Sequence, residues 1–143
     1  MIHPYSHYPA RAARHWPDHT AIIDGERSVT FAELDGHAEA IARNLAAAGL
    51  IPGDRVAILQ HNCLEYVLAV VGIARAGGVV VPMLGALTEP EHAFIRADSG
   101  ARFVVALTEP QLDRAWRIAE NRAAVLTVGA SRAGSGLLAG DAP

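Results

Sequence analysis

Histidines gather near the start of the chain at a spacing that metal sites use. His3 and His7 lie four residues apart, and so do His15 and His19. On a continuous helix this spacing would place both imidazoles of a pair on one face, where they could bind one metal ion. Prolines interrupt both pairs, and no Asp, Glu or Cys shares a face with them. We therefore interpret these residues as solvated loop histidines and predict no metal site.

Three further residues that could take part in chemistry follow a short apolar run. Cys63 is placed in the first turn of a predicted helix, where the helix dipole can lower the pKa of a thiol. It is also predicted to lie between buried strands, so a packed, inert thiol is the preferred interpretation. His61 and Asn62 come at the carboxyl end of a predicted parallel strand, where ligands bind in such sheets. A helix-capping role already accounts for Asn62, and a structural role is favoured.

The last part of the sequence contains a glycine pattern of the kind that can hold phosphate. Gly129 and Gly134 follow a predicted strand with four residues between them, and Ser135 comes next. A phosphate-binding loop needs a lysine on the terminal phosphates and a helix behind it. Ser135 stands at the lysine position, and too few residues come after it for a helix. We expect a linker, and an unrelated nucleotide-binding domain that uses this loop is the weaker alternative.

Composition limits the classes of function. The chain has 143 residues, 51% of them hydrophobic, and a formal net charge of −3. This is the length of one domain with its own core, and the charge gives no reason to expect nucleic acid as a partner. No apolar run approaches the ~20 residues of a membrane span, and the N-terminus lacks the pattern of a secretory signal. The single cysteine fits a reducing cytoplasm.

The residue types also exclude several mechanisms. All twelve basic residues are arginine, so the chain offers no lysine for chemistry. The motifs contain no nucleophile–base pair, no paired carboxylates and no metal-ligand set. From the residues alone we assign no catalytic, cofactor-binding or metal-binding residue, and the residues that bind substrate are unknown.

A strand–helix–strand unit over residues 49–82 positions His61, Asn62 and Cys63. The apolar run 56–59 indicates a buried strand, and a helix then begins at Asn62, with Glu65 at the spacing of a reciprocal cap. Gly77 and Gly78 end this helix before a second buried strand over residues 79–81. A unit of this length predicts parallel strands with a right-handed crossover.

Elements of similar type flank this unit. Before it we expect an extended segment, a short helix, a hairpin around Asp24-Gly25 and a helix that begins with a Thr30–Glu33 capping box. After it we expect two further helix–strand pairs, whose helices begin at the capping boxes of Thr88 and Thr108. The predicted ranges, in order, are 1–9, 10–15, 21–29, 30–48, 88–99, 103–106, 108–121 and 125–128.

The pattern also predicts which sides of the two later helices are buried. Ala93, Phe94 and Ala97 form the apolar stripe of the first of them. In the second, the stripe includes Trp116, which we interpret as a core residue together with Leu112, Ala115 and Ala119. The whole order of elements predicts an α/β fold with a mainly parallel sheet flanked by helices over residues 1–128. Residues 129–143 are rich in Gly, Ala and Ser and indicate a tail or linker.

Six phrases resemble, in order and spacing, the N-terminal part of the AMP-forming acyl-CoA synthetases, the adenylate-forming ligases. The resemblance covers roughly residues 8–107 and would make residues 1–128 an incomplete first subdomain of such a ligase. The segment after Pro82 is more similar to acid–CoA ligases than to amino-acid adenylation domains, which usually carry an aspartate there. It departs from both at Leu84, so the subfamily stays open. The phrases are HWPDHTAIIDG (15–25), VTFAELD (29–35), GLIPGDRVAIL (49–59), RAGGVVVP (75–82), LTEPEH (87–92) and DSGAR (98–102).

The resemblance implies a two-step reaction that uses ATP, Mg²⁺ and coenzyme A. A carboxylic acid, fatty or of another organic class, would form an acyl-adenylate and pyrophosphate, and coenzyme A would then displace AMP. In the family the phosphate-binding loop and its lysine lie beyond the region matched here, so we carry over no catalytic residue. We expect the chain by itself to be inactive, to bind none of these cofactors tightly and to need the remainder of the ligase domain. The alternative is a free-standing, non-catalytic binding or interaction module.

Overall fold

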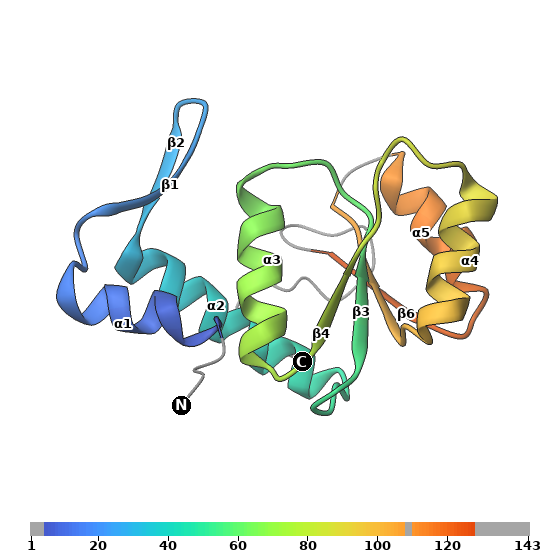
Figure 1. The fold of residues 1–143 in the computed structure, drawn as a ribbon, viewed down its shortest axis with the longest axis horizontal. Coiled ribbons are helices and arrows are strands. Elements are labelled where there is room, and N and C mark those ends of the chain that lie inside the picture. Colours follow the sequence, from blue (N-terminus) through green and yellow to red (C-terminus); the bar gives the residue numbers. More distant parts are fainter. Residues whose placement is uncertain (1–4, 108–109, 128–143) are drawn as a thin grey trace.

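The computed structural model describes residues 5–107 and 110–127 and confirms the predicted α/β fold (Figure 1). Four parallel strands form the main sheet in the order β4-β3-β5-β6. Parallel neighbours joined through helices are what the strand–helix–strand pattern requires. The strands are β3 (Arg55–Ile58), β4 (Val79–Pro82), β5 (Phe103–Val105) and β6 (Ala124–Leu126).

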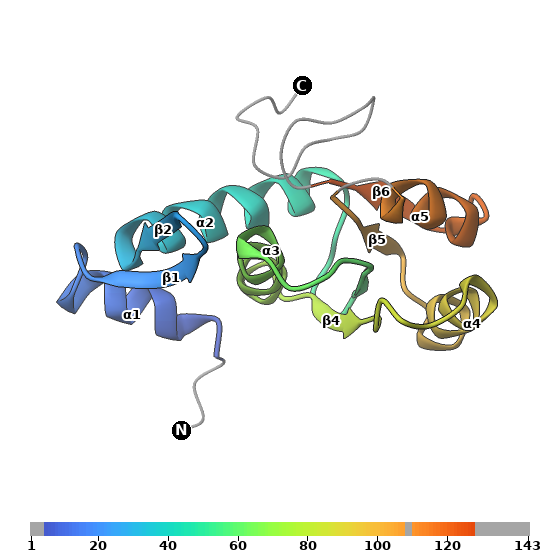
Figure 2. The same ribbon diagram turned by 90° about the horizontal axis from the view of Figure 1, so that it is seen from above.

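Helices cover both faces of this sheet (Figure 2). On one face, α2 (Phe31–Ala47) and α3 (Leu64–Arg75) pack over Val56 and Ile58 of β3. On the other face, α4 (Glu89–Ser99) and α5 (Gln111–Ala119) lie over Ala57. Because side chains alternate along a strand, successive residues of β3 enter two separate apolar clusters.

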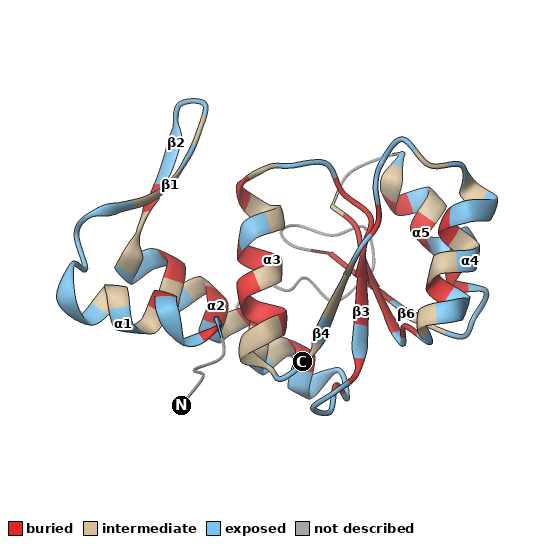
Figure 3. Ribbon diagram, viewed as in Figure 1, coloured by how far each residue is buried: buried red, intermediate tan, exposed pale blue. Residues whose placement is uncertain are grey.

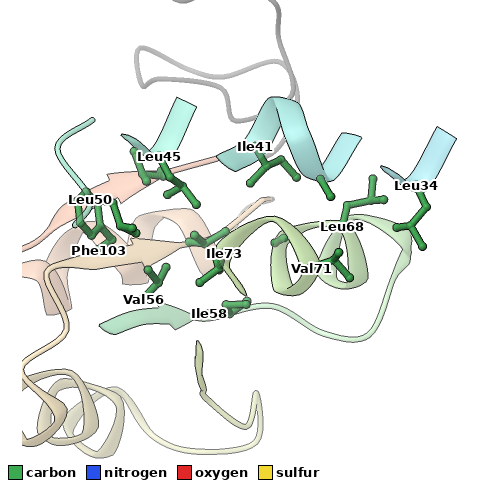
Figure 4. Close-up of a cluster of buried hydrophobic side chains, with 14 of the residues drawn as sticks. Leu34, Ile41, Leu45, Leu50, Val56, Ile58, Leu68, Val71, Ile73 and Phe103 are labelled. Carbon is green, nitrogen blue, oxygen red and sulfur yellow. The ribbon is translucent and has the colours of Figure 1, made fainter. Parts of the chain in front are cut away.

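Close packing between α2 and α3 anchors the first cluster (Figure 4). Ile41 and Leu45 of α2 are fully buried, and so is Ile73 of α3. Gly72 lets the two helices approach, because a Cβ added there would lie 2.4 Å from Cγ2 of Ile41. A glycine in the interior of a helix is unfavourable by itself, and this contact gives the reason for it.

An N-terminal region lies beside α2 and α3. It consists of α1 (His7–His15) and an antiparallel hairpin of β1 (Thr20–Asp24) and β2 (Arg27–Thr30), as the Asp24-Gly25 turn predicts. The expectation of an extended segment over residues 1–9 is wrong for its described part, because α1 begins at His7. Pro9 falls in the first turn of α1, where the missing amide hydrogen is not needed.

The predicted helix starts at Thr30 and Thr88 are confirmed, and the predicted start at Asn62 is wrong. At α2, the Glu33 amide donates to Oγ1 of Thr30 at 3.2 Å, and the Thr30 amide donates to the Glu33 carboxylate at 2.7 Å. At α3, the prediction that Asn62 caps the helix is wrong, since the N-cap residue is Cys63 and no side chain of the cap accepts a hydrogen bond. The Leu64 amide instead donates to Asp24 of the hairpin at 3.0 Å.

Two predicted helix faces also differ from the structure. In α4 the buried residues are His92 and Arg96, whereas Phe94 of the predicted stripe is 67% exposed. In α5 Ile118 is buried, and Trp116, predicted as a core residue, is 51% exposed. The polar residues of α4 can be buried because each finds a hydrogen-bond partner in the fold.

Strand β4 is less buried than predicted. It forms one edge of the described sheet, and its residues are exposed or half-buried (Figure 3). Thr108 and the predicted linker over residues 129–143 lie outside the described residues. No helix in the described ranges is long and apolar enough to cross a membrane.

Candidate functional site

The segments that follow β3, β4 and β5 border a cavity of about 170 Å³. This is the carboxyl edge of the parallel sheet, the edge at which ligands bind in open α/β folds. His61 lies here, as the sequence predicts, whereas Asn62 is exposed and does not line the cavity. The lining residues are Leu59, Gln60, His61, Gly85, Pro110, Gln111 and Arg114.

Gln60 is the buried polar residue of this cavity. Gln60 is only 5% exposed, and its Oε1 accepts a hydrogen bond from the Leu107 amide at 3.2 Å. Its Nε2 lies 3.0 Å from Nδ1 of His61. An amide nitrogen is a donor, so Nδ1 of His61 accepts and its Nε2 carries the ring proton. Gln60 thus joins the ends of β3 and β5 and orients the imidazole.

A second polar cluster holds the loop between β4 and α4 at the rim of the cavity. His92 is fully buried, with Nε2 2.9 Å from the carbonyl oxygen of Leu84 and Nδ1 3.4 Å from Nη1 of Arg114. The same Nη1 donates to the carbonyl oxygen of Leu87 at 3.2 Å. Sequence reasoning missed Gln60, His92 and Arg114. The only available signal was a polar residue inside an apolar pattern.

Thr127 lies at the same edge of the sheet, directly after β6. It is 4% exposed, and its hydroxyl has no hydrogen-bond partner among the described residues. A buried hydroxyl without a partner costs roughly 1–3 kcal/mol. Thr127 is therefore a polar position at this edge whose hydrogen-bonding capacity is unused in the described part of the chain.

Cys63 does not have the environment of a reactive thiol. It is half-buried as the N-cap residue of α3, and burial raises the pKa of its thiol. The helix dipole, which would lower that pKa, does not prevail here. The structure therefore agrees with an inert thiol, although Cys63 is less deeply packed than the sequence suggests.

The histidine pairs do not meet in the fold. His7 and His15 occupy the two ends of α1, and His19 lies in the segment before β1. His3 lies outside the described residues. Within residues 5–107 and 110–127, no three or more His, Cys, Asp and Glu side chains come together in a way that could hold a metal ion.

Ion pairs connect the hairpin to the start of α3. The Asp24 carboxylate accepts from the Leu64 amide and, at 2.6 Å, from Nη2 of Arg27, and both bonds lower the pKa of Asp24. Arg27 also pairs with Glu65, which lowers the pKa of that carboxyl group. These charges satisfy each other and the helix terminus, so their role is structural.

The cavity of about 170 Å³ has room for a small ligand, and its lining residues determine what chemistry it can support. Hydrogen-bonding groups from three segments converge on the cavity, yet the described residues that line it include no Ser, Thr, Cys, Asp or Glu.

The sequence matches a known family over most of its length. A profile of the AMP-binding enzyme family matches residues 9–139. A feruloyl-CoA synthase from Amycolatopsis sp. is 40% identical over 98 residues, which are 68% of this chain and 20% of that protein. The fatty acid–[acyl-carrier-protein] ligase ScoC from Streptomyces coeruleorubidus is 40% identical over 92 residues, which are 64% of this chain and 18% of ScoC. The chain thus spans about a fifth of these curated relatives.

Solved structures agree with the sequence match. MbtA from Mycobacterium smegmatis is 30% identical, with a TM-score of 0.85 over 100% of this chain and 28% of MbtA. A benzoate CoA ligase from Burkholderia xenovorans shares the fold, with a TM-score of 0.85 over 99% of this chain and 29% of the ligase at 23% identity. The chain therefore belongs to the AMP-binding enzyme family, the adenylate-forming ligases.

Proposed function

We propose that this chain is the first part of an ATP-dependent acid–CoA ligase of the cytoplasm. Residues 1–128 would be the N-terminal subdomain of its AMP-binding domain, and residues 129–143 would link that subdomain to the remainder of the ligase. The observation that carries this proposal is the family match over residues 9–139, combined with relatives that are about five times longer than the matched region.

The proposed reaction has two steps. A carboxylate attacks the α-phosphorus of Mg²⁺-bound ATP, which gives an acyl-adenylate and releases pyrophosphate. The thiolate of coenzyme A then attacks the acyl carbon and releases AMP. The negative charge that develops on phosphate in the first step needs fixed positive charge nearby. Because the chain contains no lysine, we propose that other parts of the ligase supply a phosphate-binding lysine and that this chain alone is inactive.

The substrate is proposed to be a fatty acid or another organic acid. The first of the two curated relatives is named for feruloyl-CoA and the second for fatty acids, so both an aromatic and an aliphatic acid belong in the tests. The sheet scaffold described here would support the active site, while the pocket for the acid would be formed mostly by the rest of the enzyme.

Exposed apolar residues beside β4 support the idea that more protein covers this region. Val79 is 48% exposed, Leu84 68% and Phe94 67%. Next to them, Leu87, Pro90, Phe94 and Ile95 help to line a shallow groove of about 410 Å³. Exposed apolar patches and unpaired strand edges are typical of surfaces that another part of a protein covers.

The nucleotide sequence beyond the codon for Pro143 tests the proposal. We expect an open frame that continues into a Ser/Thr/Gly-rich loop with a lysine. The polypeptide from that frame should form coenzyme A thioesters with ferulate, benzoate or fatty acids, and the 143-residue chain is the matched control. A stop codon directly after Pro143, with no such loop encoded nearby, would overturn the proposal and favour a non-catalytic module.

A further inference from the structure

We propose that the outer face of α1 is a docking surface for an acidic polypeptide segment of a partner protein. This surface, called the α1 face below, combines an exposed tyrosine ring with two arginines that pair with none of the described residues. It lies on α1, in the N-terminal region of the chain. The α1 face consists of Tyr8, Arg11 and Arg14, which line one cavity.

The aromatic residue of the α1 face, Tyr8, is accessible to solvent. Tyr8 is 59% exposed, whereas Ser6 and Pro9 are buried. Tyrosine, tryptophan and arginine are the residue types enriched at the energetic centres of protein interfaces.

The arginines of α1 are not balanced by acidic residues in the same helix. The helix carries Arg11 and Arg14 and contains no Asp or Glu. Neither guanidinium group has a hydrogen bond or ion pair within the described part of the chain, whereas Arg27, Arg75 and Arg117 all pair with carboxylates. In a chain with a net charge of −3, this is a local positive patch, and it favours a partner with carboxylates.

The α1 face also borders a groove. A cavity of about 400 Å³ runs along the helix, lined by His7, Tyr8, Ala10, Arg11 and Arg14. Residues three apart on a helix share a face, so Arg11 and Arg14 lie next to each other along the groove. An apolar side chain of the partner would enter the groove while flanking carboxylates pair with the two guanidinium groups.

Other polyanions fit this surface less well. Two arginines neutralise at most two phosphates, too few to hold nucleic acid against a net charge of −3. A bilayer would require a free apolar side of α1, but that side carries the buried Pro9 and packs against the rest of the fold. An acidic polypeptide with an apolar anchor satisfies both the charge and the groove.

Fluorescence anisotropy with a short, labelled peptide of leucine and glutamate tests the proposal on the purified chain. We expect saturable binding that weakens with salt, and no binding of the matched peptide of leucine and lysine. Reversing both charges, Arg11→Glu with Arg14→Glu, should weaken binding about tenfold or more. Tyr8→Ala should weaken binding as well, because it removes the ring that lines the groove.

The matched control reverses two arginines elsewhere, Arg43→Glu with Arg122→Glu. Both are exposed and have no side-chain partner in the described ranges, so the change of net charge is the same. Thermal melts establish that each variant is folded, and Arg11→Gln with Arg14→Gln replaces the reversal if it unfolds. The proposal is overturned if the control pair weakens binding equally, if no saturable binding occurs, or if anionic vesicles or duplex DNA bind more tightly than the acidic peptide.

Discussion

Arg96 shows how a single residue stabilises the layer formed by α4 and α5. Its Nε donates to the carbonyl oxygen of Ile118 at 2.9 Å, and its Nη2 pairs with Glu120 at 3.0 Å. Only 6% of Arg96 is exposed, while Glu120 keeps contact with water. The bonds close off the end of α5, where Glu120 has a left-handed backbone conformation and the last carbonyls need donors.

Replacing Arg96 by alanine should therefore destabilise the fold. We expect a loss of about 1–3 kcal/mol in the free energy of unfolding, because the Ile118 carbonyl loses its donor and a cavity forms between α4 and α5. Urea denaturation measures this loss. Arg122→Ala, at an exposed position without a side-chain partner among the described residues, is the control and should change stability by less than about 0.5 kcal/mol. Equal midpoints for both variants would contradict the role of Arg96.

Asp24 predicts a specific dependence of stability on pH. Its pKa lies below the ordinary value of 3.8 in the folded chain, because of the Leu64 amide first and Arg27 second. A carboxyl group with a lowered folded pKa adds stability above its unfolded pKa, and this stability is lost as the pH falls through the folded pKa. Asp24→Asn should be less stable than the parent at neutral pH, and the difference should shrink in acid. Urea midpoints at several pH values test this, and a difference that grows in acid would refute it.

At the scale of elements, helix ends and helix faces differ in how far the sequence predicts them. The ends of α2 and α4 are local: Thr30 and Glu33 cap one, and Gly100, with a positive φ, ends the other. The faces of α4 and α5 depend on which carbonyls approach from distant segments. The sequence could therefore assign the elements and the parallel sheet, but it placed Phe94 and Trp116 inward.

In the candidate site, too, the sequence predicts what local pattern determines and misses what depends on contacts between distant segments. His61 was predictable because it follows a buried strand directly, and the carboxyl edge of a parallel sheet is a general place for ligands. Gln60, His92 and Arg114 were not, because they come from three separate segments that meet only in the folded chain. Asn62 failed as a cap because Asp24, forty residues before Leu64, reaches the Leu64 amide.

The contact between α2 and α3 gives a prediction with an internal control. Gly72→Ala should cost about 1–3 kcal/mol, because the new methyl group would collide with Ile41 in the core. Gly36→Ala, also inside a helix but with nothing within 4 Å of the added Cβ, should stabilise the chain by about 0.5–1 kcal/mol. Chemical denaturation of both variants measures the two shifts. Shifts of the same sign would show that the packing at Gly72 is not as described.

At the scale of the whole molecule, the apolar residues beside β4 mark the side on which we propose that the rest of a ligase lies. Phe94→Ser should reduce self-association of the isolated chain with little effect on its stability, because Phe94 is 67% exposed. Ile51→Ser, 60% exposed but away from this groove, is the control. Sedimentation velocity measures the association. If the two substitutions act alike, the surface beside β4 has no special role.

Our central proposal is that this chain is a scaffold of an adenylate-forming ligase and does not activate an acid by itself. Carboxylate-dependent exchange of pyrophosphate into ATP tests it most directly, since exchange reports the first chemical step alone. With ferulate, benzoate and fatty acids, the 143-residue chain should show no exchange above background, while the longer polypeptide from an open frame should show it with at least one acid. Acid-dependent exchange by the 143-residue chain alone would contradict the account.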